Sequence, residues 1–493
     1  MEGLLIGLDA VLTMKGLLAV VIGTALGIVI GALPGIGPSL GIALLIPFTY
    51  NLDPTTSLIL MICLYQGAEY GGSITAILVS TPGGAAAAAT VLDGYAMNRK
   101  GQGGKAIGAS LTASAIGGLL SAAAVVVLTP PLASVALSFG PPEYFALGMF
   151  GIGMVSSLSA ESPLKGWLVA VLGLVLVTIG IDPISGTARF TMGSYELLEG
   201  IPYITALIGL FAITEVFNMI DEGEPKHDVT KRLAGTYLTL RDTIRIMPAT
   251  LRGSLIGTIL GIVPGLGATV AAWMAYDQEK RWSKHPETFG KGEIKGVAAP
   301  EAANNAVVGG NLVPLLALGI PSSPTAALLM GALIIHGLQP GPQLFVKAPE
   351  VVYGIYAGLA ASIVSVYVLG QLAMPVWVRV VAVPNAILAP ITFALAIVGA
   401  YAMRNMVFDV WLALAFGVVG YVLKKYRFPL PPLVLALVLG YMIESNFRRS
   451  LLMAGGSASI FLERPISLVL LLIAAGSLLW PLAKRWRAAW VGG

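Results

Sequence analysis

The chain has 493 residues, of which 56% are hydrophobic and 11% are charged, and its formal net charge is +4. Soluble domains average about 25% charged residues, so this chain has too few to cover a surface in water. With a mean hydropathy of +0.86, it does not fit a soluble enzyme, a disordered protein or a nucleic-acid reader. Cys63 is the one cysteine, which excludes an intrachain disulfide and a cysteine-based metal site. The composition indicates a polytopic membrane protein.

The N-terminus does not fit a signal peptide. Such a peptide has a basic start, a short apolar stretch and a small-residue cleavage site. Here Glu2 and Asp9 are acidic, and Lys15 is the first basic residue. The apolar run over residues 16–33 continues into more membrane sequence, which predicts that it is the first helix of the mature chain.

Apolar runs recur along the whole chain. Since a spanning helix needs about 20 apolar residues, we expect an all-α protein of about 10 to 13 membrane segments, forming one transmembrane domain over residues 1–493. The charge clusters between the runs are expected to be loops. The basic groups Lys424–Arg427 and Lys484–Arg487 lie two spans apart, so the bias of lysine and arginine toward the cytoplasm places them, and the C-terminus, on that side.

The stretch between residues 251 and 276 predicts a helix hairpin. Basic loops flank it on both sides, and both belong in the cytoplasm by the same charge rule. Its midpoint, Gly261–Gly267, reads GIVPGLG, and proline and glycine are poor residues for the interior of a continuous helix. Two half-helices that enter and return satisfy both observations. The alternative is a single kinked span with one basic loop outside.

The same pattern, G-x-x-P-G-x-G, occurs at Gly31–Gly37, 230 residues earlier. A second pair of matching phrases follows each copy: YGGS and STPGG from Tyr70, and VGGN and IPSS from Val308. Two phrases in the same order at similar spacing indicate an internal repeat. We expect two pseudo-symmetric repeats of inverted topology, at residues 15–220 and 251–445, joined by a charged loop at 221–250 and followed by a C-terminal helix and basic tail at 446–493.

Broken helices at matching positions of two halves are the best pointer in a sequence to a transporter's binding site. Half-helix N-termini present free amide hydrogens that suit an anion such as a carboxylate, and exposed carbonyls suit a cation. The groups expected to line these sites are Pro34, Gly35, Ile36, Gly37, Ser39, Gly71, Gly72, Ser73, Ser80, Thr81, Pro82, Gly265, Leu266, Gly267, Thr269, Gly309, Gly310, Asn311, Pro321, Ser322 and Ser323.

Four further polar residues are candidates for coupling to an ion: Glu69, Glu301, Asn304 and Asn305. A carboxylate inside a membrane segment is costly, and is by default a functional hypothesis. The two glutamates could bind a proton or a cation, or could hold helices together by hydrogen bonds. Adjacent buried amides can coordinate an ion or a carboxylate.

Several long motifs carry a family resemblance. GALPGIGPSLGIALLIPFTY, YGGSITAILVSTPGG, GIVPGLGATVAAWMAY and APEAANNAVVGGNLVPLLALGIPSSPTAALLMGAL resemble the large membrane subunit of the tripartite tricarboxylate transporters, the TctA family, over about residues 15 to 445. The resemblance implies a multi-pass importer of the bacterial cytoplasmic (inner) membrane, driven by a sodium or proton gradient. It also implies two partners, a small TctB-like membrane subunit and a periplasmic TctC-like solute-binding protein.

Tri- and dicarboxylates such as citrate are the substrates that the resemblance implies, and other organic acids, including aromatic ones, remain open. A passive anion channel shares the broken helices and is the other alternative. An intramembrane enzyme is not expected, because no Ser–His or paired-Asp arrangement lies at the breaks. The three scattered histidines predict no transition-metal site, Gly101–Lys105 lacks the spacing of a phosphate loop, and no cofactor is expected beyond the coupling cation.

Overall fold

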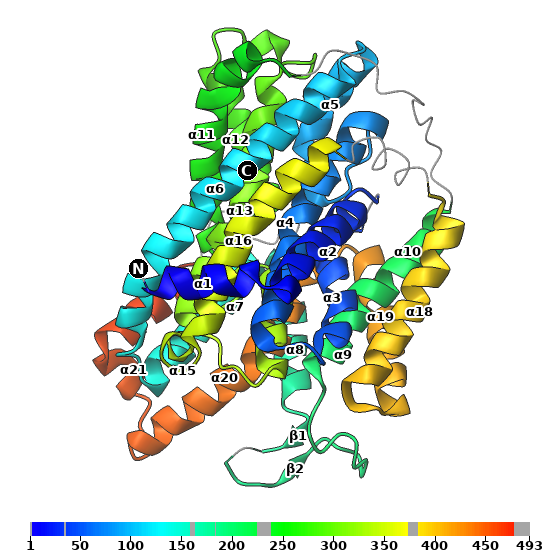
Figure 1. Cartoon of the computed structure of the whole chain (residues 1–493). Coiled ribbons are helices and arrows are strands. Elements are labelled where there is room, and N and C mark those ends of the chain that lie inside the picture. The colour runs from blue at the N-terminus through cyan, green and yellow to red at the C-terminus, as the bar shows by residue number, and fades with distance from the viewer. Residues whose placement is uncertain are drawn as a thin grey trace, which may run out of the picture.

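The computed structural model describes residues 2–33, 36–157, 163–182, 184–223, 238–372 and 383–477, and these are almost entirely helical (Figure 1). The first half contains α1 (Glu2–Leu12), α2 (Met14–Gly31), α3 (Gly37–Thr49), α4 (Pro54–Val79), η1 (Ala85–Ala87), α5 (Ala88–Arg99), α6 (Gly103–Ala136), α7 (Pro141–Ser157), α8 (Pro163–Val177), β1 (Gly180–Ile181), β2 (Ala188–Arg189), α9 (Tyr203–Leu207), the π-helical turn η2 (Ile208–Ile213) and α10 (Thr214–Glu222).

The second half repeats this order of helices. It contains α11 (Leu240–Ile262), α12 (Gly267–Trp282), η3 (Pro286–Thr288), α13 (Lys295–Leu318), α14 (Pro324–Ile335), α15 (Gln343–Lys347), α16 (Pro349–Leu372), α18 (Asn385–Arg404), α19 (Val407–Lys425), α20 (Pro431–Met453) and α21 (Ile460–Glu463). A further apolar helix covers Pro465–Ser477.

Six of the described helices are long and apolar enough to cross a membrane: Met14–Gly31, Gly103–Ala136, Tyr203–Asp221, Pro349–Leu372, Asn385–Arg404 and Val407–Lys425. Helices α4 and α13, with 26 and 24 residues, also exceed the length that a span requires. Nearly all their residues are buried, because other helices surround them at the centre of the molecule. The arrangement is that of an all-α polytopic membrane protein.

Glycines four residues apart, which we call glycine stripes, pack α2 against α4 and α11 against α13. A Cβ atom at Gly23 or Gly27 would lie 2.3 Å from a carbonyl oxygen of α4, and one at Gly253 or Gly257 would lie 2.3 or 2.1 Å from a carbonyl oxygen of α13. Small residues four apart let two helix backbones approach closely in a membrane. The two stripes are 230 residues apart, so each repeat uses the same device to place its long central helix.

Helices α4 and α13 run antiparallel at the centre. Tyr65, near the middle of α4, bonds to Asn311, and the carbonyl of Glu69 further along α4 accepts from Asn304, which precedes Asn311 in α13. Because α2 is parallel to α4 and α11 is parallel to α13, the two halves are oriented in opposite directions. This is the geometry of inverted repeats.

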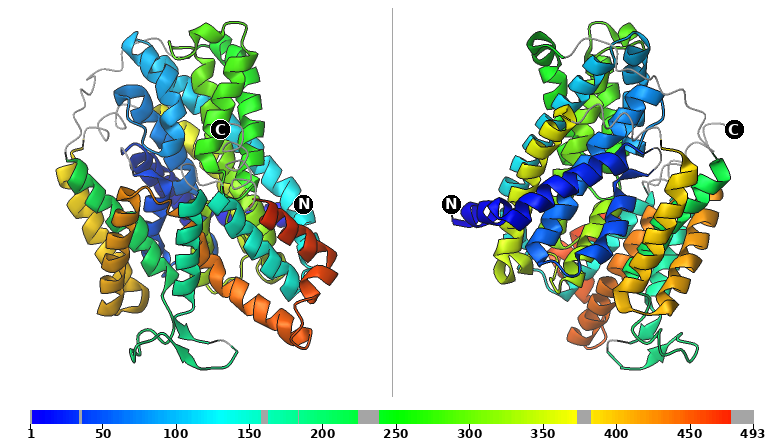
Figure 2. Two further views of the ribbon diagram at one scale, coloured as in Figure 1. Left: turned by 180° about the vertical axis from the view of Figure 1, so that it is seen from behind. Right: turned by 45° about the vertical axis from the view of Figure 1, so that its right-hand side comes forward.

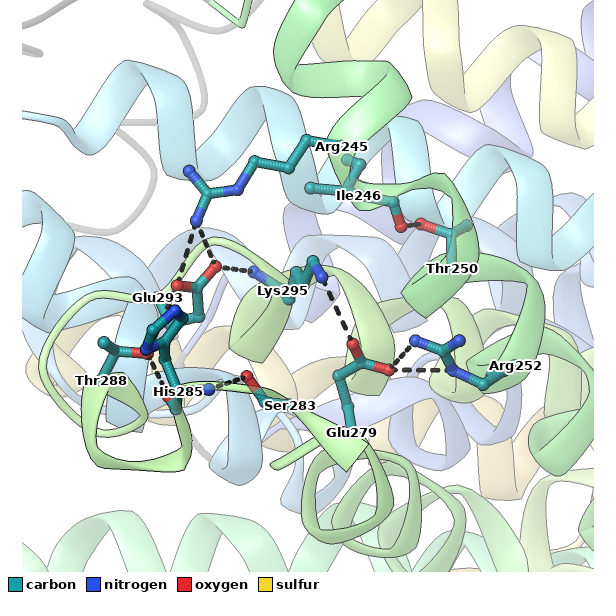
Figure 3. Close-up of polar contacts among 10 residues, drawn as sticks. All are labelled: Arg245, Ile246, Thr250, Arg252, Glu279, Ser283, His285, Thr288, Glu293 and Lys295. Atoms are coloured by element: carbon teal, nitrogen blue, oxygen red, sulfur yellow. Dashed lines mark hydrogen bonds and ion pairs between the residues drawn. The ribbon is translucent and has the colours of Figure 1, made fainter. Parts of the chain in front are cut away.

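Helices α11 and α12 form the predicted hairpin, and ion pairs clamp its open end to α13. Arg252 of α11 donates to Glu279 of α12 at 3.0 and 2.5 Å, and Lys295 of α13 lies 3.9 Å from the same carboxylate (Figure 3). Arg245 of α11 pairs with Glu293, in the loop before α13, at 3.1 Å. The pairing of α11 with α12 shows two helices folded back on each other, as the hairpin prediction requires, and not one continuous helix.

The predicted charged loop at 221–250 is partly wrong. Helix α10 continues to Glu222, and α11 begins at Leu240, so the first turns of α11 fall inside the predicted loop. A capping box explains the early start: the Thr239 hydroxyl accepts from the Asp242 amide at 3.2 Å, and the Asp242 carboxylate accepts from the Thr239 amide at 3.2 Å. At the other end, α20 continues to Met453, so the predicted C-terminal segment at 446–493 begins inside a helix.

Two outer bundles flank the centre, and each one mixes the two repeats. Helices α7 and α8 of the first half pack against α20 of the second, whereas α10 and η2 of the first half pack against α18 and α19 of the second. Figures 1 and 2 show α10, α18 and α19 side by side at one edge of the molecule. The last helix of each repeat is therefore exchanged with the other repeat.

A two-stranded hairpin, β1–β2, projects from the end opposite to α11 and α12 (Figure 1). Charged groups tie it to α20: Arg189 bonds to Glu444, at 3.1 Å for one of two contacts, and Arg448 bonds to Asp182. Asp182 also accepts from the amides of Ile184 and Ser185, both at 2.8 Å. These backbone and arginine hydrogen bonds lower the pKa of Asp182 well below its ordinary value.

Candidate functional site: the helix breaks and the polar centre

The helix breaks of the two repeats have the same backbone geometry. Helix α3 begins at Gly37 with φ +63°, and α12 begins at Gly267 with φ +62°. Helix α4 ends before Ser80 with φ +62°, and α13 ends before Gly319 with φ +70°, and a proline follows two residues later in each case. Left-handed residues and proline terminate helices, so the local sequence dictates both breaks. Pro34 and Gly35 lie outside the described residues.

Asn311 organises the break of the second repeat. Its amide nitrogen donates to the Tyr65 hydroxyl at 2.7 Å and to Ser323 Oγ at 2.9 Å, and its Oδ1 accepts from Ser322 at 2.7 Å. Ser323 also accepts from the Ala326 amide at 3.1 Å, which caps the N-terminus of α14. Three predicted residues thus meet in one buried network, together with Tyr65, which was not predicted.

The tip of the α11–α12 hairpin touches this network. The Gly265 amide donates to the carbonyl of Ser322 at 3.0 Å, and the predicted residues Leu266, Thr269 and Pro321 are close by in the chain. Ser39 of α3, from the first repeat, shares a hydrogen bond of 2.8 Å with Thr325 of α14. Hydroxyl and amide groups from both repeats therefore gather where two half-helices, α12 and α14, begin.

The matching break of the first repeat is made of glycine. At the spacing of 239 that relates Pro82 to Pro321, Gly72, Gly83 and Gly84 take the places of Asn311, Ser322 and Ser323. The helix packing has the same spacing, since Gly71 packs against Ile28 and Gly310 against Thr258, so the predicted match of YGGS with VGGN is one residue out of register. The Gly83 amide donates to the carbonyl of Gly72 at 3.2 Å, and a Cβ at Gly83 would lie 1.8 Å from the carbonyl oxygen of Gly31. Only glycine fits here. Ile36 is buried next to this break, Ser80 is exposed, and Thr81 contacts the carbonyl of Val79 at 3.5 Å.

Four predicted binding residues have another role. Gly71, Gly309 and Gly310 lie inside α4 and α13, where the structure uses them for close helix packing and not at a helix break. A Cβ at Gly71 would lie 2.5 Å from the carbonyl oxygen of Ile28, and one at Gly310 would lie 2.7 Å from that of Thr258. Ser73 bonds to the carbonyl of Tyr70, away from the break. The prediction that these residues line a break is wrong, because both helices continue past the Gly-Gly pairs.

A second polar cluster surrounds Glu301 in the second turn of α13. Thr90 of α5 donates to one carboxyl oxygen, and Ser110 and Ser114 of α6 lie 3.2 and 3.5 Å from the other. The Asn305 amide donates to Ser114 at 2.8 Å and to the carbonyl of Glu301 at 3.1 Å. This brings together two predicted ion-coupling residues, Glu301 and Asn305, in a set of hydroxyl groups.

The amides of α4 and α13 connect across the centre. Gln66 donates to Asn305 at 3.0 Å, and Asn304 donates to the carbonyl of Glu69 at 3.1 Å. Among the described residues, Gln66 Oε1, Asn304 Oδ1 and the Tyr70 hydroxyl are buried without a hydrogen-bond partner. Buried polar atoms are rarely left unpaired. These atoms of the polar centre could therefore still form hydrogen bonds to water or to a small polar ligand.

Thr90, Ser110, Ser114 and Tyr65 were not predicted. The spacing of Ser110 and Ser114, four residues apart in an apolar run, is a signal that could have drawn attention to one face of α6. Their partner Glu301 lies 191 and 187 residues further along the chain, so sequence spacing alone could not identify it.

One apolar cavity, of about 540 Å³, lies elsewhere, between α10 and α18. Its lining includes Val216, Phe217, Pro390 and Phe393, with Asn385 as the one polar side chain among the lining residues. Such a surface does not suit a carboxylate. The described residues include no group of three or more histidine, cysteine, aspartate or glutamate residues that could hold a metal ion.

A comparison with known protein families matches the chain to one family. Its sequence model, described as the tripartite tricarboxylate transporter TctA family, matches residues 17–435. An uncharacterized 52.8 kDa protein in the TAR-I ttuC' 3' region of Agrobacterium vitis is 39% identical over 472 residues, covering 96% of this chain and 94% of that protein. An uncharacterized protein in the TAR-II ttuC' 3' region of the same organism is 38% identical over 215 residues, covering 44% of this chain and 89% of that protein.

No solved structure matches the chain. The family match covers both helix breaks and the polar centre, and the TAR-I relative extends over nearly the full length. The chain belongs to the tripartite tricarboxylate transporter TctA family.

Proposed function

We propose that the chain is the large permease subunit of a binding-protein-dependent secondary transporter that imports a tri- or dicarboxylate such as citrate. The observation that carries the proposal is the network at the second break, where Asn311, Ser322 and Ser323 meet the N-termini of α12 and α14. Hydroxyl groups, amides and half-helix N-termini are donors for an anion. Another organic acid could bind the same donors, and it is the alternative substrate.

The proposed setting is the bacterial cytoplasmic membrane. Basic residues gather at the end where α11 starts: Lys105 pairs with Asp242 of α11, and Lys100 donates to the carbonyl of Lys291 in the loop before α13. This favours the cytoplasm for that end. Lys424 pairs with Glu215 of α10, shortly before the connection to α11, so the α19 end belongs to the same side. The β1–β2 hairpin would then face the periplasm, where a TctC-like binding protein delivers substrate.

The proposed partners are this binding protein and a small TctB-like membrane subunit. The direct test is uptake of labelled citrate by vesicles that contain the chain and both partners, with and without a sodium gradient, a pH gradient and the binding protein. Accumulation that needs the binding protein and a gradient supports the proposal. Uptake that ignores the binding protein contradicts it, and equilibration without accumulation would favour the passive channel instead.

A substitution at the hairpin tip tests the assigned site. Gly265 has φ +87°, and its amide donates to Ser322, so Gly265→Pro removes both the donor and the required backbone conformation. We expect uptake to be lost while the amount of protein in the membrane stays close to that of the wild type. Gly101→Pro, in the loop between α5 and α6, is the control for inserting proline at a left-handed glycine. Wild-type uptake by Gly265→Pro would exclude the tip from the transport site.

A further inference from the structure

Glu301 is completely buried and has no cationic neighbour. Its exposed fraction is 0%, and no lysine, arginine or histidine of the described residues lies within ion-pair distance of its carboxyl group. An ionised carboxylate removed from water without a counter-charge is very unfavourable. Its contacts are the hydroxyl groups of Thr90, Ser110 and Ser114.

The hydroxyl protons around Glu301 can be counted. Ser73 donates to the carbonyl of Tyr70 at 2.8 Å, so its oxygen accepts the proton of Ser110, 2.7 Å away. A serine hydroxyl has only one proton. Ser110 is also placed to donate to Glu301 Oε2 at 3.2 Å, but its single proton cannot serve both contacts, so a proton on Glu301 would satisfy the second one. The network is complete when Glu301 is a carboxylic acid.

The other ionisable groups near Glu301 do not supply a positive charge. Helix α4 contributes Glu69 and Tyr70, which are acidic groups and are also buried. Helix α5 contributes Asp93, one turn from Thr90, whose oxygens accept from the Tyr276 hydroxyl of α12 at 2.9 Å and from three backbone amides of residues 290–293. Negative or neutral groups thus face Glu301 from three neighbouring helices.

Several cations of the remaining neighbouring helices are already paired, and none of the described ones forms an ion pair with Glu301. On α11, Arg245 bonds to Glu293 and Arg252 bonds to Glu279. Lys295, at the start of α13, lies closest to Glu279, and Lys105, at the start of α6, pairs with Asp242 at 2.7 Å. A metal cation at Glu301 would have to stand between the carboxylate and hydroxyl groups that are already in direct contact. A proton needs no such space.

We propose that Glu301 is a proton-binding site, protonated in this conformation, and that a proton is the coupling ion of the importer. The second part rests on the proposed function; the first does not. Glu301 belongs to the second repeat, whereas Thr90, Ser110 and Ser114 belong to the first. A movement of α5 and α6 away from α13 would withdraw the hydroxyl groups, let water reach the carboxyl group and favour release of its proton. Rebinding of the proton would restore the closed network.

Infrared difference spectra of the purified chain in lipid vesicles test the proton site without any substrate. We expect a carbonyl band of a protonated carboxylic acid that is present in the wild type at neutral pH, is weaker in Glu301→Gln, and is unchanged in Glu143→Gln. Glu143 is the matched control because it is buried but pairs with Arg464. If Glu301→Gln keeps the full band, or if the wild type has none, the proposal is wrong. Ser110→Ala leaves the carboxyl group in place and should shift the band, which keeps the test decisive if Glu301→Gln does not fold.

Transport measurements test the coupling separately. Glutamine at position 301 keeps the shape of the protonated acid but cannot release a proton. In vesicles with both partners, we expect Glu301→Gln to lose uptake driven by a pH gradient while it retains exchange of labelled for unlabelled citrate. Uptake by Glu301→Gln that still follows the pH gradient, or wild-type uptake driven by sodium alone, contradicts proton coupling. Absence of any carboxylate transport by the wild type would refute the proposed function, and the infrared band would still decide the proton site.

Discussion

Gly37 and Gly267 begin α3 and α12 with nearly the same φ, and the glycine stripes of α2 and α11 approach α4 and α13 equally closely. The side chains at the two breaks nevertheless differ. The second repeat has Asn311, Ser322 and Ser323 where the first has only glycine. The two breaks thus share a backbone conformation but differ in their side chains. The glycines common to both breaks determine the backbone conformation, and they place no demand on whether the surrounding side chains are polar.

The open ends of the two hairpins differ in the same way. Arg252 and Glu279 clamp α11 to α12, whereas the positions 230 residues earlier are Ile22 and Thr49. The Thr49 hydroxyl bonds to the carbonyl of Ile46 within its own helix, so it holds no other element. The second hairpin is therefore joined at its open end by an ion pair, whereas the matching positions of the first hairpin carry no charge.

Substitutions in the glycine stripes test whether the shared backbone is needed equally in both halves. Gly27→Val and Gly257→Val place a side chain against carbonyl oxygens that would lie 2.3 and 2.1 Å from the new Cβ. We expect each to destabilise the protein by at least about 3 kcal/mol and to abolish its folding. The measurement is the yield of monodisperse protein and its thermal unfolding in detergent.

Gly476→Val is the control, since no atom lies within 4 Å of a Cβ at that exposed helical glycine. If only one of the two stripe variants fails to fold, the halves do not depend equally on close helix packing. If both melt with the wild type, the stripes are not close contacts.

Asn311→Ala tests the side-chain difference between the breaks. The substitution leaves Tyr65, Ser322 and Ser323 without their common partner in a buried place. We expect a loss of stability of about 2 kcal/mol and a clear rise in the citrate concentration that gives half-maximal uptake. Asn446→Ala is the control, because that amide contacts the carbonyl of Met442 on α20, away from the breaks. Unchanged half-saturation would remove Asn311 from the substrate site.

A double-mutant cycle at Arg252 and Glu279 measures the clamp of the second hairpin. Arg252→Met leaves Glu279, which is buried, with only Lys295 nearby, and we expect it to destabilise the protein by about 1 to 3 kcal/mol. Adding Glu279→Met should recover part of this loss, since no buried charge then remains unpaired. Ile22→Met, at the matching position of the first hairpin, should have almost no effect on thermal unfolding. Equal effects at the two positions would show that the clamp contributes nothing.

The smallest expected effect concerns the start of α11. Burial raises the pKa of Asp242, but hydrogen bonds from Lys105 and Thr239 lower it more, from 3.8 to about 2. A lowered pKa contributes stability that is fully present above the unfolded value and is lost as the pH falls through about 2. Asp242→Asn should therefore lower the melting temperature slightly at neutral pH, and the difference from the wild type should vanish near pH 2. A difference that does not depend on pH would contradict the ion pair with Lys105.

The helix breaks could be predicted because local chemistry determines them. Left-handed glycines beside a proline end a helix, so Gly31–Gly37 and Gly261–Gly267 mark the hairpin tips within the chain itself. Proline alone is not enough, because Pro300 and Pro314 lie inside α13. The surroundings of Glu301 could not be predicted in this way. Thr90 and Ser110 reach it from helices that precede it by 211 and 191 residues, and serine or threonine in an apolar helix often bonds only to its own backbone.

The Gly-Gly pairs were misplaced for a related reason. In the sequence, Gly71 and Gly310 resemble glycines that end a helix, but their role depends on a neighbouring helix whose backbone packs directly against them. Pattern alone does not distinguish a glycine that ends a helix from one that makes room for another backbone. The early start of α11 is not evident from the sequence, because its first turns are polar and a charged stretch between apolar runs predicts a loop.

The exchange of last helices between the outer bundles affects how the chain is assembled. Helix α10 leaves the ribosome long before α18 and α19, against which it packs, and α7 and α8 are complete before α20 exists. When the first half enters the membrane, α7 and α8 therefore lack their neighbour α20, and α10 lacks its neighbours α18 and α19. Its packing is finished only when residues 385–453 arrive. A fragment that ends at the connection between the repeats should accordingly be a substrate for membrane quality control and not a stable half-transporter.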